Sequence, residues 1–162
     1  MWNLKIHEKF KLFFLENVLG PSSNKKHSWK QISSWLSLSC SLCNSGQESI
    51  KHLFIECPFA RIAWSLSPWP IRFDPLSYNS IVDWVKAIIN PTISLGINKD
   101  EEHKFIIHAA VLCDVLWMNR NEANHKSEPL EPRIVATQVG RVAANHFQAW
   151  DFKVFDKGRS EG

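Results

Sequence analysis

The chain has 162 residues, with 19 Lys and Arg against 16 Asp and Glu, which gives a formal net charge of +3. This length suits one core, or a small module attached to a modest core, and is too short for a multidomain enzyme. Hydrophobic residues at 44% and charged residues at 22% are ordinary globular values, which exclude a disordered or collagen-like chain. The charge is too small for composition alone to indicate nucleic-acid binding.

The first part of the chain shows helical patterns. Apolar residues recur every three to four positions over residues 2–19, which predicts an amphipathic helix that ends at Gly20 and Pro21. A short helix is predicted around residues 29–36, after a polar loop. Residues 40–46 are rich in Ser, Asn and Gly and predict a tight turn. The helical pattern resumes over residues 48–66, and Pro58 interrupts it.

The second part begins with a proline-punctuated segment, residues 68–78, which is typical of a linker. Three helix starts follow. Ser80 with Asp83 forms a capping-box pattern, Asn98 precedes three acidic residues, and Pro132 suits a first helical turn. The helix after Asn98 is expected to run to about residue 126. Because no strand alternation is visible, the predicted class is mainly α, with two to three helices over residues 79–155.

One motif carries chemistry. Cys40 and Cys43 are separated by two residues, and His52 and then Cys57 follow them. Two close thiolates in one turn can converge on an ion, and a histidine and a third cysteine complete a tetrahedral site. Four protein ligands leave no open position, so the expected zinc ion is structural. The alternative is that the three cysteines are simply buried, the histidine is incidental, and no metal binds.

The spacing of the last two ligands makes a structural demand. Five residues along a regular α-helix rotate the side chain by about 140°, so His52 and Cys57 cannot face one ion from such a helix. The helix must end or bend before Cys57, and Pro58 supplies a reason, since it disfavours the α region for its predecessor. Glu48 lies one turn before His52 and is a candidate to orient its imidazole, unless it is an exposed first-turn carboxylate.

The residues around this motif resemble a known family. The run from Cys40 to Trp64 contains, in order, the short motifs Glu-Ser, His-Leu-Phe, Cys-Pro and Ala-Arg. In this it is similar to the zinc-binding domain that follows the reverse transcriptase of plant non-LTR (LINE-type) retrotransposons. The opening around Trp2 and the Trp117–Arg120 segment also resemble that family. The resemblance implies a zinc module at 1–67, a linker at 68–78, and a segment at 79–155 that leads towards an RNase H domain.

The chain also departs from the family. The usual Leu-Pro-Thr before the cysteines is absent, and no Tyr-x-Asp-Asp polymerase signature occurs. Asp151 and Asp156 are too close together to represent RNase H carboxylates. No Gly-rich phosphate loop and no nucleophile elbow is present. These features predict a protein without catalytic activity, either a retroelement remnant or a domesticated fragment.

The resemblance implies that the module assists nucleic-acid handling. Eight Lys and Arg stand against four Glu up to residue 61, so the module is basic, whereas the rest of the chain is slightly acidic. The candidates to contact RNA or single-stranded DNA are Lys25, Lys26, Lys30, Lys51 and Arg61. Aromatic residues among them, such as Trp29, Trp35 and Phe54, are expected to belong to the core more often than to stack on bases.

A second hypothesis comes from another class. In it, zinc only holds Trp-rich helices together, and the C-terminal helices bind a protein partner. Cys113 is expected to be an inert buried thiol on the apolar face of a long helix. No stretch approaches the ~18 apolar residues of a membrane span, and no signal peptide is visible, so an intracellular setting without a membrane partner is expected.

Overall fold

The computed structural model describes residues 39–123 and 130–160, with side chains up to residue 149. In this part every regular element is helical, as the sequence predicts. The helices of α type are α3 (Pro58–Ser65), α4 (Ile81–Ile89), α5 (Pro91–Leu95), α6 (Glu102–Ala123) and α7 (Pro132–Ser160). A π-helical turn, η1 (His52–Glu56), and two 3-10 turns, η2 (Pro75–Ser77) and η3 (Lys99–Glu101), complete the set. The helices predicted within residues 2–36 lie outside the described residues.

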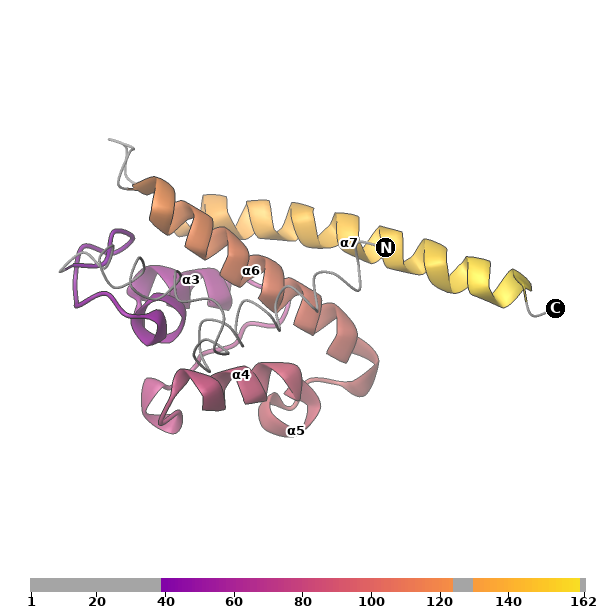
Figure 1. Ribbon diagram of the computed structural model, residues 1–162, viewed down its shortest axis with the longest axis horizontal. Coiled ribbons are helices and arrows are strands. Elements are labelled where there is room, and N and C mark those ends of the chain that lie inside the picture. The colour runs from indigo at the N-terminus through magenta and orange to yellow at the C-terminus, as the bar shows by residue number, and fades with distance from the viewer. Residues whose placement is uncertain (1–38, 124–129, 161–162) are drawn as a thin grey trace, which may run out of the picture.

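Helix α6 is the centre of the arrangement. It lies along α7, while α4 and α5 pack on another side of it and α3 touches both α6 and α7 (Figure 1). Residues from Phe105 to Leu116 are buried almost without interruption, so α6 is covered on several sides and not on one face alone. The sequence predicts one apolar face there, which understates this burial. The C-terminal part of α7 extends past the other helices (Figure 1).

The predicted helix starts are confirmed. Ser80 accepts a hydrogen bond from the backbone N–H of Asp83, whose carboxylate accepts one from the backbone N–H of Ser80, so the capping box is complete. Asn98 caps the 3-10 turn that leads into α6, and Pro132 is the first residue of α7. The Ser80 and Asn98 side chains satisfy backbone donors that a helix otherwise leaves without partners, whereas Pro132 has no backbone N–H that needs one.

An aromatic cluster joins parts of the chain that the sequence assigns to separate segments. Trp64 of α3 packs edge-on against Phe73 at 5.1 Å between ring centroids and against Trp84 of α4 at 5.9 Å. Phe54 of η1 stacks on Trp84 at 6.2 Å. The proline-rich segment therefore contributes Phe73 to the core instead of forming a free linker. The described parts of the three predicted segments share one hydrophobic core, and the domain boundaries stay a prediction.

His108 gives the core a dependence on pH. It is 4% exposed on α6, edge-on to Trp69, and burial lowers its pKa to about 4. The folded state keeps this imidazole neutral, whereas the unfolded chain protonates it below its ordinary pKa of about 6.5. The free energy of unfolding is therefore expected to fall between pH 6.5 and pH 4, by up to about 3 kcal/mol from this group.

Urea unfolding at several pH values tests this expectation. The variant His108→Leu should show a shallower decline towards acid than the wild type, because it has no imidazole to protonate. Zinc release acts on both proteins alike, so the difference between the two curves isolates His108. Parallel curves would show that His108 does not contribute.

Candidate metal centre

The first two cysteines lie in a tight turn. The backbone N–H of Cys40 donates to the carbonyl of Gly46 at 3.1 Å, and that of Asn44 donates to the carbonyl of Cys40 at 2.8 Å. Asn44 and Gly46 adopt positive φ angles of 53° and 95°, which Asn and Gly tolerate best. This turn, as the sequence predicts, brings the Cys40 and Cys43 side chains to the same place.

The second pair of ligands comes from a π-helical turn. The backbone N–H of Cys57 donates to the carbonyl of His52 at 2.6 Å, the five-residue bond of a π-helix, and Ser49 Oγ accepts from the N–H of His52 at 2.9 Å. Cys57 itself is extended, with φ −60° and ψ 123°, and Pro58 then begins α3. The predicted break before Cys57 is confirmed. The wide turn lets two residues five apart meet, which a regular α-helix forbids.

The four donor atoms form one cluster. They all lie within 4.8 Å of one another, in a set made of Cys40, Cys43, His52 and Cys57. A tetrahedral zinc ion with ligand distances of about 2.3 Å to sulfur and 2.0 Å to nitrogen holds two sulfurs about 3.8 Å apart and a sulfur and a nitrogen about 3.5 Å apart. The Sγ atoms of Cys40 and Cys57 are 3.9 Å apart, and Cys43 Sγ lies 3.4 Å from His52 Nε2. These two separations match those of a tetrahedral zinc site.

The thiols of Cys40 and Cys57 lie within hydrogen-bond distance of each other. A hydrogen bond with Cys57 lowers the pKa of Cys40 to about 5, and the same hydrogen bond, together with burial, raises the pKa of Cys57. One sulfur is therefore ready to bind a cation as thiolate, while the other must release its proton when the ion binds. Zinc binding is accompanied by proton release.

Glu48 has a different partner from the one suggested by the sequence. Its two carboxylate oxygens accept hydrogen bonds from Nε and Nη2 of Arg120 at 2.5 and 2.8 Å, and both residues are buried. The described hydrogen bonds of Glu48 thus run to α6 and not to His52. The alternative of an exposed carboxylate is wrong, because Glu48 is only 5% exposed.

Arg120 is a residue near the centre to which the sequence pattern assigns no role. Its guanidinium also lies 5.6 Å from the centre of the Trp117 ring and interacts with the charge of Cys40. Arg120 stands 72 positions after Glu48, so no local pattern links the two residues. The sequence feature that could have pointed to Arg120 is the Trp117–Arg120 motif of the family resemblance. The pair fastens the segment between the ligands to the central helix.

Gly46 lies directly against a ligand. A Cβ atom at this position would lie 3.0 Å from Cε1 and 3.4 Å from Nδ1 of His52, and the φ angle of 95° also disfavours a side chain. Gly46→Ala is therefore expected to weaken zinc binding by about tenfold or more and to destabilise the fold by more than the roughly 1–2 kcal/mol of backbone strain.

Gly96 provides a matched control for this prediction. It also has a positive φ of 69°, but a Cβ there meets nothing within 4 Å. Gly96→Ala should cost only backbone strain and leave zinc affinity unchanged. Competition with a zinc-chelating dye and urea unfolding measure both quantities. Equal zinc affinities for the two variants would contradict the role of Gly46.

The structure describes only some of the residues that are predicted to contact nucleic acid. Lys51 lies 3.4 Å from Glu56 and forms an ion pair with it, whereas Arg61 is exposed on α3. Phe54 is fully buried, which excludes it from stacking on bases. Lys25, Lys26 and Lys30, with Trp29 and Trp35, lie outside the described residues. Cys113 is a buried thiol whose pKa burial raises, in agreement with its expected inert role.

No described helix is long and apolar enough to cross a lipid bilayer.

The chain matches no curated protein and no solved structure. Residues 1–64 match the family model for zinc-binding in reverse transcriptase, a stretch that contains all four members of the cluster. Family match and geometry together support a structural zinc ion. Residues 1–64 of this chain are therefore similar to the zinc-binding domain of reverse transcriptases, which is an accessory and not the catalytic part of those proteins.

Proposed function

We propose that this chain is a zinc-stabilised accessory module that binds RNA or single-stranded DNA and has no catalytic activity of its own. The observation that carries the proposal is the match of residues 1–64 to a domain that accompanies reverse transcriptase, an enzyme that works on nucleic acid. The detailed motifs between Cys40 and Trp64 favour an origin in a plant LINE-type retrotransposon.

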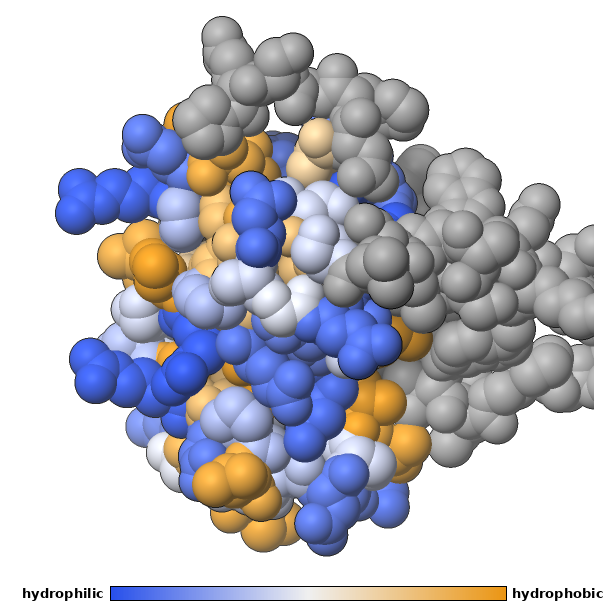
Figure 2. All heavy atoms as spheres, turned by 90° about the vertical axis from the view of Figure 1, so that its left-hand side faces the viewer, coloured by the Kyte–Doolittle hydropathy of each residue, from blue (hydrophilic) through white to orange (hydrophobic). Residues whose placement is uncertain are grey.

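The charge distribution supports the proposal. The part of the chain up to residue 61 has an excess of four basic residues, and its candidates for phosphate contacts are Lys25, Lys26, Lys30, Lys51 and Arg61. Hydrophilic residues gather across the middle of the face at the zinc-binding end of the molecule (Figure 2). Because Lys51 is paired with Glu56, Arg61 is the stronger of the two candidates that the structure describes.

Binding of labelled single strands to the zinc-loaded chain tests the proposal. We expect fluorescence anisotropy to show an affinity for single-stranded RNA or DNA that weakens roughly 20- to 50-fold between 50 and 200 mM salt, as three to four phosphate contacts require. Absence of binding, or binding that salt does not weaken, would contradict it.

A groove on α7 favours the second candidate, a module that binds a protein through its C-terminal helices. Ile134 is 59% exposed and lines, with Val142, a groove of about 510 Å³ on that helix. If single strands do not bind, this groove becomes the stronger basis for a function.

A further inference from the structure

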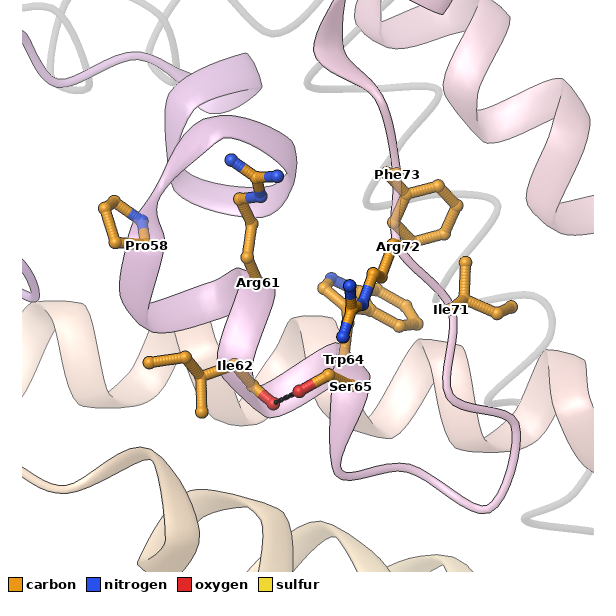
Figure 3. Close-up of a pocket in the computed structure, with 8 residues that line it drawn as sticks. All are labelled: Pro58, Arg61, Ile62, Trp64, Ser65, Ile71, Arg72 and Phe73. Atoms are coloured by element: carbon orange, nitrogen blue, oxygen red, sulfur yellow. Dashed lines mark hydrogen bonds between the residues drawn. The ribbon is translucent and has the colours of Figure 1, made fainter.

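A groove runs between α3 and the segment that follows it. It has a volume of about 340 Å³ and its lining comes from both sides (Figure 3): Pro58, Arg61, Ile62, Trp64 and Ser65 from α3, and Ile71, Arg72 and Phe73 from the facing segment. The volume lies within the range of sites that hold small ligands or parts of larger ones. The α3 side of the groove lies at the end of the family match, which runs to residue 64, and the facing segment lies beyond it.

The charge of this groove has one sign. Arg61 and Arg72 are both exposed, one on each side, and no Asp or Glu is among the lining residues. Within the described residues neither guanidinium forms an ion pair, in contrast to Lys51 and Arg120, whose charges are balanced by Glu56 and Glu48. Two guanidinium groups that flank one groove and pair with no described carboxylate favour an anion with several acceptor oxygens.

The floor of the groove is rigid and apolar. Trp64 is 1% exposed, its indole N–H donates to the carbonyl of Phe54 at 3.1 Å, and its ring packs against Phe73. Ile62 is 48% exposed and offers apolar surface beside the arginines. A fixed apolar wall next to cations suits a chain in which sugars or bases alternate with phosphates, and it lowers the entropic cost of binding.

We propose that this groove holds the backbone of a single-stranded nucleic acid, with Arg61 and Arg72 contacting its phosphates from opposite sides and the sugar or base lying against Ile62. The inference rests on the proposed function and locates its nucleic-acid binding in this groove. Arg72, which lies beyond the family match and was not a candidate from the sequence, becomes a specific contact. The α7 groove also contains two arginines, Arg133 and Arg141, but all its lining comes from one helix and none of it is aromatic.

The test compares two charge-matched double variants of the full zinc-loaded chain. Arg61→Gln with Arg72→Gln removes the two groove cations, and Arg133→Gln with Arg141→Gln removes two exposed cations from α7. For the groove variant we expect the affinity for a single-stranded oligonucleotide at about 100 mM salt to fall roughly tenfold or more and the salt slope to decrease by about 1.4, the value of two contacts. The α7 variant should keep both values close to the wild type.

Zinc content and helicity of the groove variant are measured alongside, and both should be unchanged because the two side chains are exposed. If the wild type binds and the groove variant keeps its affinity and salt slope, the groove assignment is wrong while the proposed function stands. If the wild type itself does not bind single strands, both fail. Equal losses in the two double variants would also overturn the assignment, because they would show a diffuse charge effect.

Discussion

Replacing Cys57 by serine is expected to abolish stoichiometric zinc binding and to unfold the segment from Cys40 to α3. Structural zinc ions contribute apparent free energies of about 10–16 kcal/mol, which equals or exceeds the whole stability of a typical domain. Because Phe54 and Trp64 belong to the same core as Trp84, the loss is expected to spread to the helices beyond. Native mass spectrometry gives the metal content, and circular dichroism gives the helical content.

Cys113 is the matched control. It is as buried as Cys57, but it lies on α6 and outside the donor cluster. Cys113→Ser should keep one zinc ion per chain and lose only the modest stability that a polar group costs in a core.

The unfolding expected for Cys57→Ser is also expected when a strong chelator removes the metal from the wild type. If the wild type kept its helical content without metal, zinc would not have the structural role expected here.

The second large effect is expected at the buried pair of Glu48 and Arg120. Glu48→Gln or Arg120→Met should each lower the free energy of unfolding by about 3–5 kcal/mol, because each leaves a buried charge without its partner. Arg120→Met should also weaken zinc binding, since Glu48 lies between Cys43 and His52 and its two hydrogen bonds with Arg120 hold this segment against α6. Urea unfolding of the zinc-loaded proteins and dye competition measure the two effects.

A double-mutant comparison separates this pair from ordinary surface pairs. Glu48→Gln combined with Arg120→Met should recover part of the stability lost in the two single variants, because no lone charge remains. The exposed pair of Lys99 and Glu102, whose lysine side chain is 77% exposed, is the control, and Lys99→Met should cost less than about 1 kcal/mol. Similar losses for Lys99→Met and Arg120→Met would contradict the argument.

Local features of this chain could be predicted because each depends on a few neighbouring residues. The spacing of Cys40, Cys43, His52 and Cys57 predicts the metal site, since ligand geometry limits which residues can converge. Pro58 predicts the break before Cys57, and Ser80 with Asp83 predicts the start of α4, since both act on their own backbone.

Long-range features could not be predicted in the same way. Periodicity shows which face of a helix is apolar, but not which helix covers it, so neither the burial of α6 on several sides nor the place of Phe73 in the core was accessible. The partner of Glu48 is 72 residues away, and no local rule fixes that register. The groove of Arg61 and Arg72 exists only because the chain reverses direction after α3.

The π-helical turn at His52 fixes where helix α3 begins relative to the metal ligands. A π-helical turn contains about one residue more than an α-helical one, and here it is followed directly by the ligand Cys57 and by Pro58, the first residue of α3. Shortening the stretch between His52 and Cys57 by one residue would therefore misplace a ligand and pull the start of α3 with it. Trp64 would be displaced from Trp84, and Arg61 from Arg72. The metal centre and the groove share one register, so an insertion or deletion at this point disrupts both.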